Sequence, residues 1–155
     1  MKKISILGAT GSVGINTLKI IAINKNKYNI IALTSYKNYK KLAKFALMFK
    51  CKYAVIGEKK YFRNLKEELF GSNIKCLAGY KSICEVASLK VDILISAIVG
   101  IAGLRPTFES IGNTKILAIA NKESVISAGN LLLKKARLMK TKIIPLDSEH
   151  NAIYQ

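Results

Sequence analysis

The sequence predicts an α/β domain with a doubly wound, mostly parallel β-sheet that carries helices on both faces. Three observations support this fold class. Short apolar runs alternate along the chain with longer segments in which apolar residues recur at helical spacing. The runs are continuously apolar, as is typical of parallel strands buried on both faces. The first run also ends in a glycine-rich turn that opens a helical segment.

The expected elements alternate strictly between strand and helix. Each strand is a β-prone or apolar run, and glycine stops the first and the third of them. The strands are expected at residues 3–7, 28–34, 53–56, 74–77, 91–96, 115–120 and 142–146. Each helix has apolar residues three and four positions apart, so that one face is apolar. The helices are expected at residues 13–23, 38–50, 59–70, 81–88, 104–111 and 122–139.

The chain has 155 residues, 50% of them hydrophobic, which suits one domain with a core of its own. No apolar run reaches the roughly 18 residues of a membrane helix. The amino-terminal residues 1–7 are interrupted too early, by Gly8, to form a signal peptide. We therefore expect a cytoplasmic protein without a membrane segment. Cys51, Cys76 and Cys84 lack disulfide or metal-ligand spacing and are expected to be reduced thiols.

The formal net charge is +17, from 26 basic and nine acidic residues, and it raises the possibility of nucleic-acid binding. Only Arg63, Arg105 and Arg137 are arginines, the residues best suited to bidentate phosphate and base contacts. The lysines are scattered through every expected element. We therefore expect no specific nucleic-acid binding, and a basic surface that favours small anionic ligands.

The turn after the first strand reads Gly8-Ala9-Thr10-Gly11-Ser12-Val13-Gly14. Its glycine spacing, G-x-x-G-x-x-G, differs from the commoner dinucleotide motif, but its place between the first strand and a helix is the same. Such a turn brings backbone N–H groups and a helix N-terminus to a pyrophosphate, which makes the fold Rossmann-like. The alternative is a turn in which glycine serves packing alone.

The end of the second strand bears on which dinucleotide binds. An NAD-preferring site usually carries an acid there, whereas this chain reads Ser35-Tyr36-Lys37-Asn38. A lysine with hydrogen-bonding neighbours suits the 2′-phosphate of NADPH, so NADPH is predicted over NADH. The alternative is that Lys37 is an ordinary solvated lysine.

Two further polar groups follow the sixth and seventh strands. Asn121, Lys122 and Glu123 are placed to meet a nicotinamide and a substrate, or else they open a helix with Asn121 as its cap. Asp147 and Glu149 are two residues apart, so in an extended segment both carboxylates leave on one side and can bind Mg²⁺ or Mn²⁺. The alternative is an N-cap that opens another helix. Spacing alone leaves both pairs of interpretations open.

Taken together, these segments resemble the N-terminal part of the 1-deoxy-D-xylulose 5-phosphate reductoisomerase family. The resemblance covers essentially the whole chain, and the Asn-Lys-Glu-Ser and Asp-Ser-Glu-His-Asn segments are more specific than the glycine turn. The segments that carry it are Ile6–Gly14, Ala97–Gly100, Leu117–Ser124 and Pro145–Gln155.

The resemblance implies a role for each matching residue. NADPH would be bound by Thr10, Gly11, Ser12 and Val13 at the pyrophosphate, by Tyr36, Lys37 and Asn38 at the adenosine end, and by Asn121 and Glu123. Substrate would be bound by Lys122, Ser148 and Glu149, and the metal, Mg²⁺, Mn²⁺ or Co²⁺, by Asp147 and Glu149. Lys122 and Glu149 would be the catalytic residues. Tyr36 departs from the family, in which many members carry a small residue such as glycine.

The implied reaction is the NADPH- and metal-dependent rearrangement and reduction of 1-deoxy-D-xylulose 5-phosphate to 2-C-methyl-D-erythritol 4-phosphate, a step of non-mevalonate isoprenoid synthesis. The substrate is a small sugar phosphate, and the full-length family is expected to form homodimers. Family members are considerably longer than 155 residues.

Residues 1–155 are therefore expected to be the NADPH-binding domain, ending at the start of the metal and catalytic region. The catalytic and C-terminal helical domains of the family are absent from these residues, so we expect this chain alone to be inactive. The alternative is a non-catalytic NADP-binding module or a remnant of the enzyme. Aspartate-semialdehyde dehydrogenases share such a glycine turn, but they need a nucleophilic cysteine in a motif that none of the three cysteines occupies.

Overall fold

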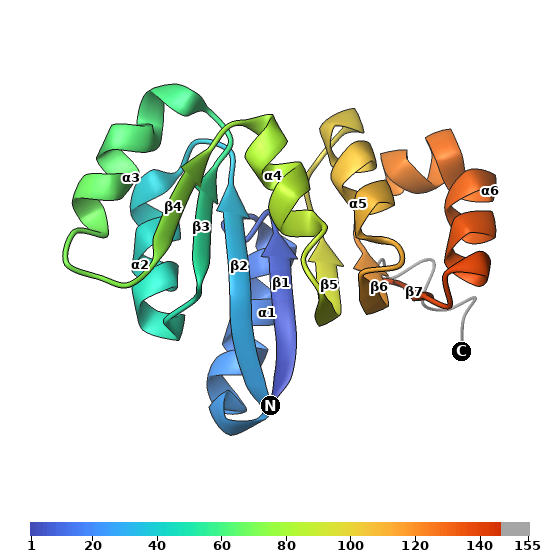
Figure 1. Cartoon of the computed structure of the whole chain (residues 1–155), viewed down its shortest axis with the longest axis horizontal. Helices are drawn as coiled ribbons and strands as arrows, with labels where there is room; N and C mark the ends of the chain where they lie inside the picture. The colour runs from blue at the N-terminus through green and yellow to red at the C-terminus, as the bar shows by residue number, and fades with distance from the viewer. Residues whose placement is uncertain (147–155) are drawn as a thin grey trace.

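The computed structural model describes residues 1–146 and contains every strand and helix that the sequence predicts (Figure 1). The strands are β1 (Lys2–Leu7), β2 (Tyr28–Ser35), β3 (Tyr53–Ile56), β4 (Lys75–Ala78), β5 (Val91–Ser96), β6 (Thr114–Ile119) and β7 (Lys142–Pro145). The helices are α1 (Ser12–Ile23), α2 (Tyr39–Phe49), α3 (Phe62–Glu68), α4 (Tyr80–Ala87), α5 (Leu104–Ser110) and α6 (Lys122–Leu138). Short 3-10 helices are η1 (Lys25–Lys27), η2 (Lys59–Tyr61) and η3 (Ile101–Gly103).

The strands form one sheet in the order β4-β3-β2-β1-β5-β6-β7, and each neighbouring pair is parallel. The predicted α/β class with a doubly wound sheet is thus confirmed, and the sheet is parallel throughout the described residues rather than only mostly so. The chain builds outward from β1 in one direction to β4, then returns to the other side of β1 with β5. Adjacent to β1 the order therefore reverses, which is where such sheets bind ligands.

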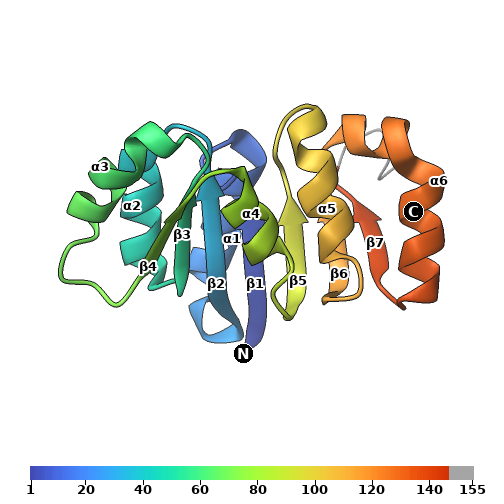
Figure 2. The same ribbon diagram turned by 45° about the horizontal axis from the view of Figure 1, so that its top comes forward.

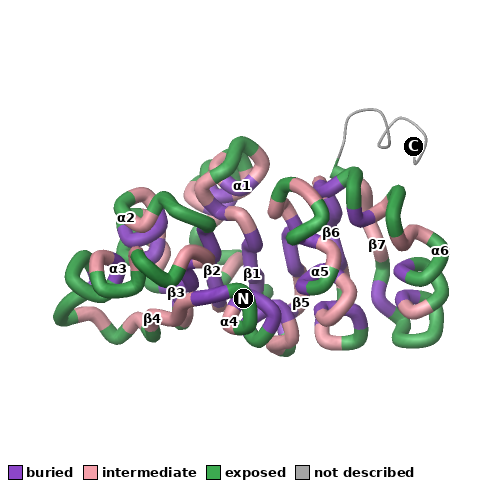
Figure 3. The backbone as a smooth tube through the Cα atoms, turned by 90° about the horizontal axis from the view of Figure 1, so that it is seen from above, coloured by how far each residue is buried: buried purple, intermediate pink, exposed green. Residues whose placement is uncertain are grey.

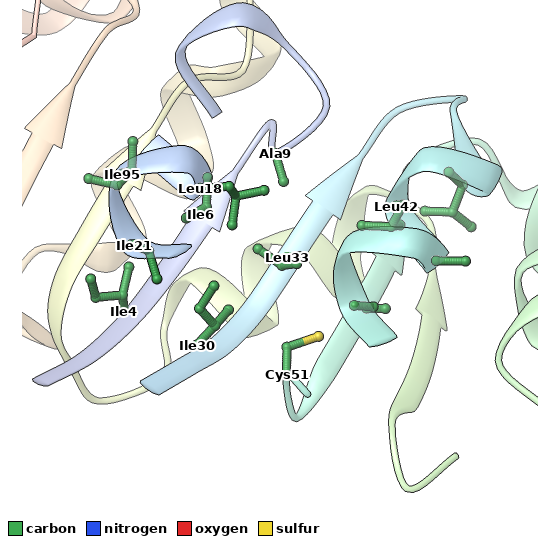
Figure 4. Close-up of a cluster of buried hydrophobic side chains, with 14 of the residues drawn as sticks. Ile4, Ile6, Ala9, Leu18, Ile21, Ile30, Leu33, Leu42, Cys51 and Ile95 are labelled. Carbon is green, nitrogen blue, oxygen red and sulfur yellow. The ribbon is translucent and has the colours of Figure 1, made fainter. Parts of the chain in front are cut away.

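Helices lie on both faces of this sheet (Figures 2 and 3), and an apolar cluster lies beneath the helices of each face. On one face α1, α2 and α3 pack against β1, β2 and β3, and Figure 4 shows the side chains at the centre of that cluster. On the other face α4 lies against β1, β3 and β4, α5 against β6 and α6 against β7. Burial on both faces explains why the strands read as continuous apolar runs.

Details of three elements differ from the predicted pattern. The helix expected from residue 59 begins as the 3-10 helix η2 and becomes α-helical only at Phe62. The α6 helix is kinked at Ala128, whose φ of −141° and ψ of 21° are not helical. The apolar run of β5 contains Asp92, whose carboxylate accepts hydrogen bonds from the Lys3 N–H at 2.8 Å and from Lys115 Nζ at 2.7 Å. These bonds lower the pKa of Asp92, with the Lys115 bond as the largest cause.

The three cysteines are free thiols, as predicted. Cys51 is buried, and its burial raises its pKa to about 12, so it is a core residue without thiolate reactivity. Across residues 1–146, the structure contains no helix with the length and apolar character needed to cross a membrane.

The central strands should contribute most to stability. Leu94 of β5 is fully buried, whereas Leu138 at the end of α6 is 74% exposed. We expect Leu94→Ala to lower the free energy of unfolding by about 2–5 kcal/mol, because it removes apolar contacts and leaves a cavity. The matched change Leu138→Ala should alter it by less than about 0.5 kcal/mol. Urea unfolding followed by circular dichroism measures both, and equal losses would contradict the assigned core.

Candidate nucleotide-binding groove

A cavity of about 450 Å³ lies at the carboxyl ends of the strands, around the point where the strand order reverses. Its lining comes from the segments that follow β1, β2, β3, β4 and β5, with apolar walls and a backbone-rich floor. The lining residues are Gly8, Thr10, Gly11, Thr34, Ser35, Tyr36, Gly57, Tyr80, Ile83, Ala97, Ile98, Val99 and Ala102.

The floor of the groove depends on two close backbone approaches. Gly8 has a φ of +84°, and a Cβ atom there would lie 2.5 Å from the Ala97 carbonyl oxygen at the end of β5. A Cβ atom on Gly14 would overlap the Gly8 carbonyl oxygen. Side chains at these two positions would separate β1 from β5, or α1 from β1. Both glycines are thus required for packing, a role that the dinucleotide interpretation of this turn also assigns to glycine.

Gly11 differs from those two glycines. The nearest atom to a Cβ placed on Gly11 is the Gly8 oxygen at 3.6 Å, so the fold leaves room there, and the residue is exposed at the groove. Gly11 is the N-cap of α1, yet no side chain of the described residues accepts a hydrogen bond from the first turn of that helix. The N–H groups of Ser12 and Val13 belong to this turn. Uncapped N–H groups and the positive end of the helix dipole form a site for an anion.

Side-chain hydrogen bonds join the glycine turn to the end of β2. Thr34 Oγ1 accepts from the Gly8 N–H at 3.0 Å, and the hydroxyls of Thr10 and Ser35 lie 2.7 Å apart. Thr34 and Ser35 are buried, so these bonds lie at the base of the groove. They place Thr10 and Gly11 beside the segment that begins at Tyr36.

Of the predicted adenosine-end residues, Tyr36 lines the mouth of the groove, and Lys37 and Asn38 follow it in the chain without lining the groove. The Tyr36 ring lies against Gly57, since a Cβ atom on Gly57 would be 2.8 Å from Tyr36 Cδ2. Tyr36 is 66% exposed. Lys37 Nζ lies 5.5 Å from the centre of that ring. Asn38 is the N-cap of α2, and its Oδ1 accepts from the Lys41 N–H at 3.1 Å. Asn38 therefore has a structural role that its motif alone did not reveal.

Several groove residues lie outside the predicted set. The Tyr80 hydroxyl donates a hydrogen bond of 2.9 Å to the Ala102 carbonyl and so joins the start of α4 to η3 across one wall. Glu58 does not line the groove itself, but it follows the lining residue Gly57 after β3 and pairs with Lys37 at 3.8 Å. Glu58 follows β3 and Tyr80 follows β4, and the carboxyl ends of these two strands carry no recognisable motif. A rule that inspects every strand end would have found them.

Asn121 is 3% exposed and holds a groove wall from behind. Its Nδ2 donates to the carbonyls of Ile98 and Gly100, at 2.6 and 2.9 Å, while its Oδ1 accepts from the Ser124 N–H at 3.0 Å. Both donors of the amide are thus used within the protein. Asn121 is the N-cap of α6, as one interpretation proposed, and it also fixes the loop that carries Ile98.

The other predicted site residues are placed as follows. Lys122 and Glu123 are exposed in the first turn of α6 and are not among the residues lining the groove. Asp147, Ser148 and Glu149 lie outside the described residues. Within the described part, no three His, Cys, Asp or Glu side chains are grouped to hold a metal ion. The Leu146 N–H donates to the Ile119 carbonyl at 2.9 Å, so β7 ends beside β6.

Comparisons with known proteins agree with this arrangement. Residues 4–129 match the family model described as 1-deoxy-D-xylulose 5-phosphate reductoisomerase. The enzyme of that name from Wolbachia pipientis subsp. Culex pipiens is 47% identical over 156 residues, covering 100% of this chain. The Zymomonas mobilis reductoisomerase solved in complex with NADPH superposes with a TM-score of 0.97 at 43% identity over 99% of this chain. A reductoisomerase solved with NADPH, fosmidomycin and magnesium superposes with a TM-score of 0.94 at 39% identity over 100% of the chain.

The match is confined to part of each relative. The chain spans 40% of the Wolbachia enzyme, and 41% and 38% of the two solved chains. Within that span the family model covers most of the residues described above, including the glycine turn, the loop after β5 and the start of α6. The chain therefore belongs to the 1-deoxy-D-xylulose 5-phosphate reductoisomerase family.

Proposed function

We propose that this chain binds NADPH in the groove at the carboxyl ends of β1, β2 and β5. The observation that carries the proposal is the open, uncapped start of α1 at Gly11, directly above the close contact of Gly8 with Ala97. A pyrophosphate suits those N–H groups and the helix dipole. The solved Zymomonas mobilis and magnesium-bound relatives that contain NADPH support the same assignment.

Each predicted cofactor residue has a role in this proposal. The N–H groups of Ser12 and Val13 hold the pyrophosphate, and Gly11, whose own N–H donates to the Gly8 carbonyl at 3.2 Å, leaves room for it. Thr10, tied to Ser35, holds the turn in place. At the adenosine end Tyr36 offers an exposed ring, Lys37 offers charge to the 2′-phosphate, and Asn38 fixes the start of α2. On the nicotinamide side Asn121 acts by holding the loop at Ile98. Glu123, exposed in the first turn of α6, contacts NADPH on the same side.

We propose further that the chain is the NADPH-binding domain of an enzyme that converts 1-deoxy-D-xylulose 5-phosphate to 2-C-methyl-D-erythritol 4-phosphate. NADPH supplies hydride when it is bound. Lys122 places positive charge where a substrate oxyanion develops, which is the usual electrostatic contribution of such a residue. Asp147 and Glu149 supply hard oxygen ligands suited to Mg²⁺ or Mn²⁺, and Ser148 and Glu149 contact the sugar phosphate. Homodimerisation of the whole enzyme stays a prediction.

The pyrophosphate site can be tested by filling it with a carboxylate. Gly11 has a φ of −81° and a ψ of 173°, which any residue can adopt, and aspartate is a favourable N-cap. We expect Gly11→Asp to keep the fold but to weaken NADPH binding by about tenfold or more, because the carboxylate caps the N–H groups and repels the phosphates. Isothermal titration calorimetry and thermal unfolding measure the two effects.

Asn130→Asp provides the control for that change, because it adds the same charge on an exposed position of α6 outside the groove lining. It should leave NADPH binding unchanged. Equal affinity in Gly11→Asp and Asn130→Asp would contradict the placement of the pyrophosphate at α1.

The proposed reaction needs more than the 155 residues. We expect the chain to bind NADPH but to show no turnover of 1-deoxy-D-xylulose 5-phosphate with Mg²⁺ or Mn²⁺, because two carboxylates rarely hold a hard cation without further ligands. A chimera that continues after Gln155 with the remainder of the Wolbachia enzyme should restore NADPH oxidation, followed by absorbance at the nicotinamide band.

In that chimera Asp147→Asn should abolish metal-dependent turnover while leaving NADPH affinity intact. Turnover by the 155-residue chain would refute the expected inactivity, and turnover that tolerates Asp147→Asn would refute the metal assignment. A chimera that binds NADPH without catalysis would support the non-catalytic module instead.

A further inference from the structure

Glu58, one of the nine acidic residues, directly follows Gly57, which lines the groove against Tyr36. The parallel pairing of β2 with β3 continues one step beyond the strands, since the Gly57 N–H donates to the Ser35 carbonyl at 2.8 Å and the Glu58 N–H donates to the Tyr36 carbonyl at 2.9 Å. This pairing fixes the backbone of Glu58 beside Tyr36 and Lys37. An acid there is unexpected, because the adjoining residues are those that favour a 2′-phosphate.

The Glu58 carboxylate lies between two lysines. Its Oε1 is 3.0 Å from Lys60 Nζ, and this hydrogen bond is the main cause of the raised pKa of Lys60. Its Oε2 is 3.8 Å from Lys37 Nζ and is buried, and it accepts no hydrogen bond within the described residues. The side chain as a whole is 25% exposed, whereas that of Lys37 is 60% exposed.

These distances indicate what Glu58 does to Lys37. A separation of 3.8 Å exceeds hydrogen-bond length, so the carboxylate attracts the ammonium group without fixing its orientation. The negative charge on Oε2 is not offset by any hydrogen-bond donor within the described residues. The field of Lys37 at the mouth of the groove is therefore partly cancelled by its neighbour.

We propose that Glu58 is a specificity-determining residue that limits the preference of this groove for NADPH over NADH. The inference rests on the proposed function, because it takes the 2′-phosphate to lie near Lys37. A phosphate there is repelled by the Glu58 carboxylate and competes with it for the lysine. A ribose 2′-hydroxyl is uncharged and meets neither effect, so NADH binding is almost independent of Glu58.

The test compares the binding of NADPH and NADH, by calorimetry at low salt, to the wild-type chain and three variants. Glu58→Gln removes the charge and keeps the shape, and Glu58→Asp keeps the charge. Glu67→Gln removes one acid elsewhere, on α3, where Glu67 pairs with Arg63 at 3.2 Å. It controls for the change in net charge.

We expect Glu58→Gln to strengthen NADPH binding by about three- to fivefold, the scale of a partly exposed charge pair, and to change NADH binding by less than about twofold. Glu58→Asp and Glu67→Gln should keep the wild-type ratio of the two affinities. The gain in Glu58→Gln should shrink as salt is raised, because the interaction is between partly exposed charges.

Weaker NADPH binding in Glu58→Gln would overturn the inference, since it would mean that Glu58 serves to hold Lys37 in place. An unchanged ratio of NADPH to NADH affinity in Glu58→Gln would overturn it as well, while NADPH binding by the wild type would leave the proposed function standing. Failure of the wild-type chain to bind NADPH would overturn the proposed function, and the inference with it.

Discussion

The contact between Gly8 and the end of β5 is the constraint on which the rest of the groove depends. It brings the turn after β1 so close to the Ala97 carbonyl that only a residue without a side chain fits. Gly14 makes a second close contact, in α1, where a Cβ atom would overlap the backbone of Gly8 and Ala9. Together they set the start of α1 at the reversal of strand order, so that Gly11, at the uncapped start of the helix, lines the cavity.

The two walls of the groove are held by different means. On the β5 side, the buried Asn121 amide binds the carbonyls of Ile98 and Gly100, so the loop is tied to the start of α6. On the β2 side, the exposed Tyr36 lines the groove, and the adjoining Lys37 pairs with Glu58. If NADPH binds as we propose, the tied loop would orient its nicotinamide end and the charged residues would discriminate at its adenosine end.

The fold was predictable because each strand is buried on both faces and each helix on one, which leaves distinct periodicities in the sequence. The glycine turn was predictable because a side chain at Gly8 or Gly14 would clash with the neighbouring backbone, so the sequence must carry glycine there. The double role of Asn121 was not, because its motif indicates the cap made by Oδ1 but not that Nδ2 donates to the carbonyls of Ile98 and Gly100. Glu58 and Tyr80 were missed because sequence spacing does not reveal which strand ends meet, and β3 and β4 end without a motif.

The central claim is that NADPH occupies the groove above α1, and amide chemical shifts measured during an NADPH titration of the isotope-labelled chain test it most directly. We predict that the largest shifts occur at Gly11, Ser12 and Val13. We predict no change at Asp92 and Lys115, which form their ion pair near the amino ends of β5 and β6, at the opposite end of the strands from the groove. Shifts that gather at those amino ends, or no shifts at Gly11 to Val13 at saturating NADPH, would contradict this placement of NADPH.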